Sequence, residues 1–380
     1  MKIEQNALFQ WATSHQDEQL DLLKTLAAIP APSHHEEQRV AFITDWLKNL
    51  GVKEIIVDEA LNVKVPFHCE GRNDITVYMA HTDLVFPDMT PLPVREKDGK
   101  LYAPGVGDDT ANVVALMMCV KYIMTEGCTA KDPVLVVFNS CEEGLGNLKG
   151  VRQIAADYEG RIKELISFDG GYKRICVRAV GSERWKVKTT TIGGHSFGSF
   201  GSPNAIAHLA GLITKLYQQE IPKVEGRKTT YNVGTIQGGT SVNTIAQDAE
   251  MLYEYRSDDK GCLDQMRQQF FDLVDAARCD DANFELELMG ERPCGSNVPE
   301  DAHRQLINRC IDAILAVGEP EPALGSSSTD SNIPLSLGIP AVTFGLYSGA
   351  KAHTREEYLK IETLEVGMKI SLLMLTGHFE

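Results

Sequence analysis

The stretch DPVLVVFNSCEEGLGNLKG, residues 132–150, is the part of the sequence that decides the fold. Its first half is a nearly uninterrupted apolar run, which is typical of a strand buried on both faces of a parallel sheet. Its second half places Glu142 and Glu143 side by side, directly after that strand. Glutamate is a poor strand former and is costly to bury without a partner. A solvated turn would explain the pair taken alone, so its meaning depends on the rest of the chain.

Expected strands and helices alternate on both sides of this stretch. This alternation predicts an α/β domain with a mixed, largely parallel sheet flanked by helices. The strands are expected at 54–59, 61–68, 74–81, 163–170 and 338–345, and the helices at 3–28, 33–51, 110–127, 145–158, 301–318 and from 361 onward. Ser33 followed by Glu36 predicts a capping box at the start of the helix 33–51.

The pattern changes in the middle of the chain. Residues 182–292 follow a strand–helix–strand–strand–helix–strand order, which is the plan of ferredoxin-like α+β domains. We therefore predict an α/β domain of residues 1–181 and 293–380, interrupted by an inserted domain of residues 182–292. A chain of 380 residues is long enough for two hydrophobic cores, which agrees with this division.

Composition excludes some classes of partner. The formal net charge of −16 argues against nucleic acid or an anionic membrane as the main partner, because both require basic patches. The nine cysteines are scattered without a CxxC spacing, which indicates a reducing compartment and no cysteine-based zinc site. The N-terminal stretch has no signal-peptide pattern, and no apolar run reaches membrane-spanning length. These features predict a cytoplasmic protein.

Acidic and histidine side chains follow five of the expected elements. Open α/β sheets bind ligands outside the carboxyl ends of their strands, so these positions are candidates for a site. They are His81 with Asp83, Asp108 with Asp109, Glu142 with Glu143, Asp169, and His353. Each has a simpler explanation when taken alone: a helix N-cap, a surface loop or a polar turn. Those explanations do not account for all five at one edge of one sheet.

Histidine and carboxylate without cysteine form a ligand set suited to catalytic zinc and similar divalent ions. Two ions about 3.5–4 Å apart need a bridging carboxylate and roughly two further ligands each. A further acid that binds no metal is then needed to take a proton from water. The set is large enough for all these roles, but the residue types do not assign them.

The ordered motifs AHTD, GVGDD, CEEG, FDGG and AHT resemble a family of dizinc peptidases. This family contains tripeptide aminopeptidase (peptidase T), glutamate carboxypeptidase, aminoacylase and acetylornithine deacetylase, and the tripeptide aminopeptidase branch is the most similar. The resemblance covers about residues 75–356. It implies a catalytic α/β domain with an inserted lid that also dimerises. It further implies two divalent ions, zinc first, with manganese or cobalt as alternatives, bound by His81 and Asp169, by Glu143 and His353, and by Asp108 as the bridge.

The resemblance also assigns residues that bind no metal. It implies that Glu142 is the general base and that Asp83 orients a histidine ligand. In the lid, His195 of GGHSFG would stabilise the oxyanion and act across a dimer interface. Asn243 would contact the substrate, and Arg256 would bind a substrate carboxylate.

The sequence departs from the family in two places. The family usually has a Lys-Gly pair shortly after the bridging Asp, whereas this chain has Thr110 and Ala111. The lid strand has Glu254 two residues before the arginine, where Asp is common. Both changes leave the implied metal ligands in place.

Asp at position 169 goes with aminopeptidases and dipeptidases in this family, whereas Glu goes with carboxypeptidases and deacylases. The resemblance therefore predicts a metallo-exopeptidase that removes the N-terminal residue from di- or tripeptides. An N-acyl-amino-acid deacylase or carboxypeptidase is the alternative within the family. A non-catalytic metal-binding homologue is the alternative of another class. The implied partners are a short peptide substrate and a second copy of the chain.

Overall fold

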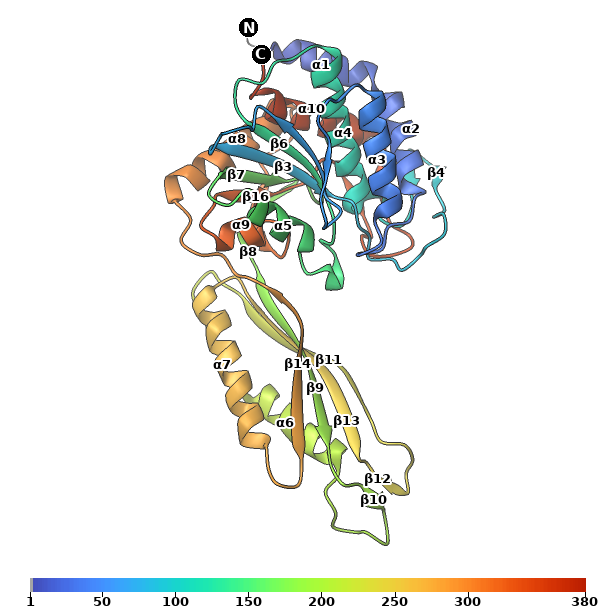
Figure 1. Ribbon diagram of the computed structural model, residues 1–380, viewed down its shortest axis with the longest axis vertical. Helices are drawn as coiled ribbons and strands as arrows, with labels where there is room; N and C mark the ends of the chain where they lie inside the picture. The colour runs from blue at the N-terminus through green and yellow to red at the C-terminus, as the bar shows by residue number, and fades with distance from the viewer. Residues whose placement is uncertain (1–2) are drawn as a thin grey trace. The chain divides into compact units, whose positions relative to one another are not determined.

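The computed structural model describes residues 3–380, and the chain forms two compact units (Figure 1). Unit 1 contains the chain up to Ala179 together with Asn297–Glu380, and unit 2 is Val180–Ser296. The predicted fold class is confirmed, since unit 1 has a mixed, mostly parallel sheet with helices and unit 2 has a separate antiparallel sheet. Within the described residues, no helix is both long enough and apolar enough to span a bilayer.

The sheet of unit 1 has the strand order β1-β2-β6-β3-β7-β16-β8-β15. Its four central strands β6, β3, β7 and β16 are parallel neighbours, so their carboxyl ends lie at one edge. Strand β8 instead runs antiparallel to β16. The strands are β1 (Ile56–Val57), β2 (Val63–Phe67), β3 (Ile75–His81), β6 (Val134–Asn139), β7 (Ile162–Ser167), β8 (Arg174–Ala179), β15 (Ala323–Ser327) and β16 (Ala341–Thr343).

Helices cover both faces of this sheet, and alternate strand residues divide between two hydrophobic cores. Tyr78 and Ala80 of β3 pack with one set of helices, and Val77 and Met79 pack with the other. This explains why the central strands read as continuous apolar runs. The first set is α1 (Gln5–Ser14), α2 (Gln16–Ala27), α3 (Glu37–Asn49), α4 (Asn112–Thr125), α8 (Glu300–Ala316) and α10 (Glu362–Thr376), and the second is α5 (Lys149–Asp157) and α9 (Asn332–Ser336).

A second, small sheet of unit 1 joins two loops that matter for the site. Its order is β17-β18-β5-β4, with β4 (Arg95–Lys97), β5 (Lys100–Tyr102), β17 (Gly349–Ala350) and β18 (Tyr358–Lys360). Strand β18 pairs with β5, so the loop between β17 and β18 comes close to the loop that follows β5. The first loop carries His353 and the second carries Asp108.

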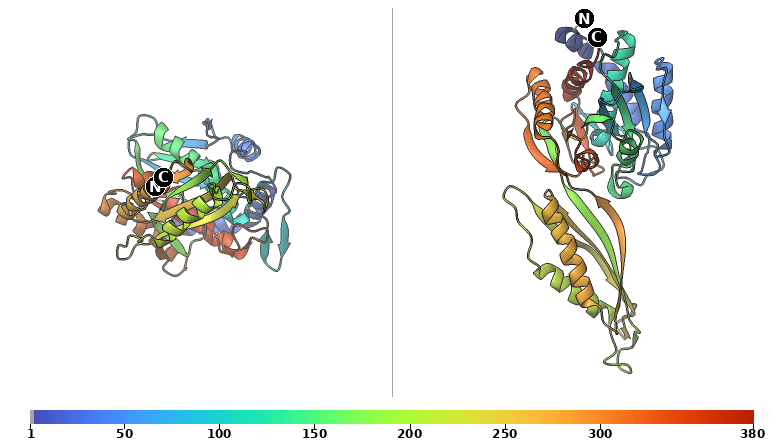
Figure 2. Two further views of the ribbon diagram at one scale, coloured as in Figure 1. Left: turned by 90° about the horizontal axis from the view of Figure 1, so that it is seen from below. Right: turned by 60° about the vertical axis from the view of Figure 1, so that its left-hand side comes forward.

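Unit 2 is an antiparallel sheet covered on one face by two helices, as Figure 2 shows from two further sides. The strand order β11-β13-β9-β14 is that of a ferredoxin-like fold, and Val187, Tyr253 and Phe270 lie in its core. Its elements are β9 (Gly181–Thr190), β10 (Gly194–His195), α6 (Ala205–Gln218), β11 (Thr229–Gly238), β12 (Thr244–Ile245), β13 (Asp248–Ser257), α7 (Lys260–Ala277) and β14 (Asn283–Arg292).

Two local expectations were wrong. The predicted helix 3–28 is two helices that meet at His15. The predicted capping box does not form, because α3 begins at Glu37 and the Glu36 carboxylate instead accepts the backbone N–H groups of His34 and Cys141. Ser33, the supposed cap, donates its hydroxyl to Asp83 at 2.6 Å. These side chains hold loops of the site rather than the end of a helix.

Candidate metal centre

The strand register brings three of the five groups of candidate residues to one edge of the large sheet. His81 at the end of β3 pairs with Asn139 at the end of β6, and Ser167 at the end of β7 pairs with both Met79 and Thr343. The loops that follow these ends carry the Glu142–Glu143 doublet and Asp169, and the doublet itself is buried. Parallel pairing therefore explains why His81, the doublet and Asp169 lie together. The expectation of one edge of one sheet is wrong for Asp108 and His353, which come from loops of the small sheet β17-β18-β5-β4.

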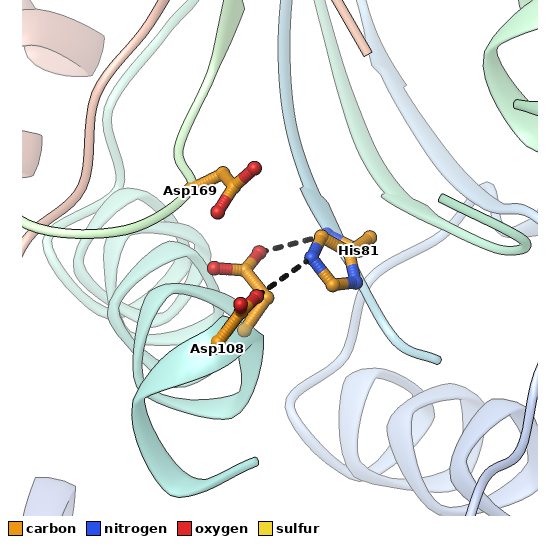
Figure 3. A group of neighbouring side chains, drawn as sticks. His81, Asp108 and Asp169 are labelled. Carbon is orange, nitrogen blue, oxygen red and sulfur yellow. Dashed lines mark hydrogen bonds and ion pairs between the residues drawn. The ribbon is translucent and has the colours of Figure 1, made fainter. Parts of the chain in front are cut away.

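Asp108 lies between the two candidate histidines. Its Oδ1 is 3.2 Å from Nε2 of His81, and its Oδ2 is 3.0 Å from Nε2 of His353. The same Nε2 of His353 is 3.1 Å from Oε1 of Glu143. Figure 3 shows Asp108 and Asp169 directed toward His81. The Asp108 carboxylate thus lies between His81 on one side and the His353–Glu143 pair on the other.

Three groups of candidate ligand atoms occur among the described residues, each with its atoms within 4.8 Å of one another. They are His81 with Asp108, Asp109 and Asp169; His81 with Glu142 and Glu143; and Asp108 with Glu143 and His353. Imidazole nitrogens and carboxylate oxygens are the donors that catalytic zinc and similar ions take in proteins. The residues therefore fit two divalent ions that share Asp108.

Asp109 belongs to the first group, but its oxygens are already engaged. Oδ2 accepts the backbone N–H of His81 at 2.9 Å, and Oδ1 accepts the amide of Asn112. Neither Asp108 nor Asp109 caps α4, whose first turn has no side-chain cap. The simpler N-cap explanation therefore fails for both aspartates, and only Asp108 presents its carboxylate to the imidazoles.

The electrostatics of the site show a concentration of negative charge. Burial alone would lower the pKa of His81, but the neighbouring aspartates raise it well above its ordinary value. Hydrogen bonds to Asp108 and Glu143 raise the pKa of His353 to about 11. Burial, followed by the charge of Asp108, raises the pKa of Asp169 to about 7. Two divalent cations would neutralise these carboxylates.

Asp83 is a fully buried clamp between two of the loops. Its Oδ1 accepts the backbone N–H of Glu142 at 2.9 Å and lies 3.3 Å from Nδ1 of His81. Its Oδ2 accepts the backbone N–H of Glu143 at 2.9 Å and the hydroxyl of Ser33 at 2.6 Å. Nδ1 of His81 also lies 3.2 Å from the backbone carbonyl of Asp83. An Nδ1–H donated to Asp83 leaves the Nε2 lone pair of His81 for a metal, as in other histidine-ligated centres.

Arg39 and Asn112 are among the buried residues that hold the site and were missed from the sequence. Arg39 of α3 is fully buried, and its Nη1 donates to the carbonyl of Thr82 at 3.1 Å and the hydroxyl of Thr110 at 3.0 Å. Burial lowers the pKa of Arg39 to about 10, against the charges of the nearby aspartates. Asn112 donates to Asp109 and to the carbonyl of Gly170. No local sequence pattern distinguishes these residues from other helix residues.

The three candidate residues of unit 2 do not all lie together. Nδ1 of His195 accepts the backbone N–H groups of Phe197 and Gly198, which places the ring proton on Nε2. The backbone carbonyl of Asn243 accepts the N–H of residue 196, next to His195. Arg256 lies toward the far end of β13, about 26 Å from its start at about 3.3 Å per residue. Its guanidinium forms a bidentate pair with Glu254.

Imidazole and carboxylate donors grouped in a mixed α/β unit are suited to a metal-dependent hydrolase, and the matching family model assigns the chain to this class. The chain belongs to the peptidase family M20/M25/M40, whose family model matches residues 77–376. The resemblance expected from the motifs is therefore confirmed.

Similar proteins within and around this family act on different substrates. A succinyl-diaminopimelate desuccinylase from Corynebacterium glutamicum is 25% identical over 351 residues, which cover 90% of this chain and 92% of that protein. A tripeptidase from Staphylococcus aureus has a similar structure, with a TM-score of 0.78, 18% identity, and coverage of 94% of this chain and 97% of that one. The Bacillus subtilis YXEP protein, a dinuclear metal binding peptidase, gives a TM-score of 0.65 at 16% identity, with 96% and 99% covered.

Proposed function

We propose that the chain is a metallo-exopeptidase that removes the N-terminal residue from di- or tripeptides. The observation that carries the proposal is Asp108, whose two oxygens face two different imidazoles, each accompanied by a further carboxylate. Asp169, rather than Glu, supports the aminopeptidase branch, and so does the structural likeness to a tripeptidase.

We assign His81 and Asp169 to one ion and Glu143 and His353 to the other, with Asp108 shared. When bound, the ions would polarise an amide carbonyl and lower the pKa of a water molecule.

Glu142 would hold the proton taken from water and pass it to the leaving amine. Its backbone is fixed by Asp83, and its carboxylate lies in the group with His81 and Glu143. In unit 2, Nε2–H of His195 is a donor suited to an oxyanion, and we propose that Asn243 and Arg256 contact the substrate. We also propose that unit 2 is an inserted lid through which two copies associate, and that the enzyme works in the cytoplasm.

The first test is a substrate panel with zinc, manganese or cobalt added. Free tripeptides and dipeptides should be cleaved, whereas the same peptides with an acetylated N-terminus should resist. Cleavage of N-acyl amino acids instead would overturn the aminopeptidase proposal, and the absence of both hydrolysis and bound metal would favour a non-catalytic protein.

The role of the base is tested separately. Glu142→Gln should reduce kcat by about 10²–10⁴-fold while two ions remain bound. The matched control is Glu159→Gln, at an exposed position just after α5, which should leave both quantities unchanged. A metal-replete and fully active Glu142→Gln enzyme would show that another group takes the proton.

A deacylase is the second candidate function. It is favoured by the identity to the desuccinylase, which extends over 90% of this chain. The two candidates differ in what lies beside the scissile amide: a free ammonium group for an aminopeptidase, or an acyl chain for a deacylase. Comparing kcat/KM for trialanine and succinylated diamino acids separates them.

A further inference from the structure

Glu357 is a buried carboxylate that lies outside the sequence motifs of the candidate site. It lies four residues after His353, on the segment that leads into β18, and its side chain is almost fully buried. Its Oε1 accepts the backbone N–H of Gly107 at 2.9 Å and that of Asp108 at 2.9 Å. Its Oε2 accepts the backbone N–H of Gly105 at 3.0 Å. Three amides of one loop therefore converge on a single carboxylate from a distant part of the chain.

The loop that donates these amides needs such an acceptor. Gly105 has a left-handed φ of 68°, and a Cβ at this position would lie 2.2 Å from the side chain of Leu84. A Cβ on Gly107 would lie 2.4 Å from the ring of Tyr347. The loop is thus packed closely on both sides, and its N–H groups cannot turn to solvent. Buried N–H groups without acceptors would be costly, and an ionised acceptor is stronger than a neutral one.

The segment that carries Glu357 is also conformationally restrained. Lys351 and His353 both have left-handed backbones, with φ of 65° and 64°. Such conformations are unfavourable in a non-glycine residue and persist only when surrounding contacts impose them. Glu357 supplies the buried contacts that tie this segment to the loop of Asp108. Arg355 also forms a bidentate ion pair with Asp88, and the arginine side chain of this pair is exposed.

We propose that Glu357 is a positioning residue. It holds the loop of Asp108 and the segment of His353 at the distance required for two metal ions that share the Asp108 carboxylate. It acts through the backbone of Asp108, because the carboxylate of Asp108 faces the imidazoles and not Glu357. The inference rests on the proposed ligand set, in which Asp108 and His353 bind the second ion together. Glu357 contributes no ligand; it fixes the distance between two ligands.

The test measures metal binding as well as activity. Cobalt(II) is titrated into metal-free Glu357→Gln, Glu357→Asp, Glu356→Gln and the parent enzyme, and its visible absorption and affinity are recorded. Gln can keep one acceptor oxygen but presents an amide donor to the remaining N–H, so one ion should bind about 10- to 100-fold more weakly with a changed spectrum. The neighbouring Glu356 is exposed and should tolerate the same change. The kcat of Glu357→Gln should fall more than its KM rises.

The controls separate failure of this inference from failure of the proposed function. Asp108→Asn should abolish paired binding; if it does not, the ligand set itself is wrong. If Asp108→Asn loses an ion while Glu357→Gln binds two ions with the parent affinity and spectrum, Glu357 is only a structural residue and the proposal is overturned. Should Glu357→Gln not fold, Glu357→Asp decides, because it keeps the charge but is too short to reach all three amides. Parent-like cobalt binding by Glu357→Asp would overturn the proposal equally.

Discussion

The substitution Asp83→Asn tests whether a buried clamp, rather than the ligands alone, sets the geometry of the centre. Asp83 accepts two backbone N–H groups and one hydroxyl, and it faces the Nδ1 of His81. Asparagine has the same shape but only one acceptor oxygen. Its best orientation keeps that oxygen toward His81 and Glu142, since the Ser33 hydroxyl can accept from the new NH₂ group.

The magnitude follows from the donor that loses its acceptor. In the favoured orientation, the backbone N–H of Glu143 meets the NH₂ group of the new asparagine. An unsatisfied buried N–H costs about 1–3 kcal/mol, so the metal-free protein should lose about that much free energy of unfolding. Repulsion between the two donors should displace Glu143 but spare His81. The ion held by Glu143 and His353 should therefore bind about 10- to 100-fold more weakly, and the other ion should change less.

The assay combines urea denaturation of the metal-free protein with calorimetric titration of zinc. The control is Asp45→Asn on the exposed face of α3, where the ion pair with Lys48 is solvent-exposed and contributes at most about 1 kcal/mol. If Asp83→Asn matches the parent within about 0.5 kcal/mol and still binds two ions equally well, the clamp does not act as described. Equal weakening of both ions would contradict the assignment of the lost bond to Glu143.

Four further predictions test other parts of the molecule. Arg39→Met should lose about 3–5 kcal/mol of unfolding free energy in urea, because it removes a buried cation from between the Thr82 and Thr110 loops; a loss under 1 kcal/mol would contradict this. His195→Ala should lower kcat by about 10²–10³-fold with unchanged metal content by elemental analysis, and an unchanged kcat would remove the oxyanion role. Phe270→Ala should cost about 3–5 kcal/mol in the thermal unfolding of unit 2, since its ring is fully buried against other aromatic rings; an unshifted melting curve would refute this. EDTA should lower the melting temperature and excess zinc should restore it, because ions that bind only the folded state stabilise it; a melting temperature insensitive to both would argue against a resident metal.

The features that were predictable from the sequence are those encoded by local pattern. The apolar run before Glu142 predicted a buried parallel strand, and β6 is buried along its whole length. His81, the Glu142–Glu143 doublet and Asp169 lie at a common edge as predicted, because the parallel strands before them end together. Asp108 and His353 reach the site from the small sheet instead, which the sequence did not predict. The ferredoxin-like order of unit 2 could be read from alternating strands and amphipathic helices. The pattern that predicts each strand or helix lies within that segment of the sequence.

The supporting residues could not be predicted in this way. Glu36, Arg39 and Glu357 bind backbone groups of loops that are distant in sequence, and a backbone amide leaves no mark in the amino-acid pattern. Ser33 and Glu36 even match the pattern of a capping box, although both serve the loops of the site. A capping box and a pair of loop-binding side chains can have the same sequence pattern, and they differ only in the tertiary contacts that the side chains make.

The site contains two acidic doublets, Asp108–Asp109 and Glu142–Glu143, whose members make different contacts. In the first doublet, the carboxylate of Asp109 accepts hydrogen bonds from the backbone N–H of His81 and from the Asn112 amide. Of the two aspartates, only Asp108 therefore faces the imidazoles. The doublet thus supplies one candidate ligand together with its own support. In the second doublet, Asp83 holds both backbone N–H groups from outside, so Glu142 and Glu143 can both direct their carboxylates toward His81. If Glu143 is a ligand and Glu142 the proton acceptor, as we propose, both depend on the buried aspartate two residues after His81. For this reason, the loss of both carboxylate oxygens of Asp83 should affect metal binding and proton transfer together, whereas Asp83→Asn should affect mainly the ion held by Glu143 and His353.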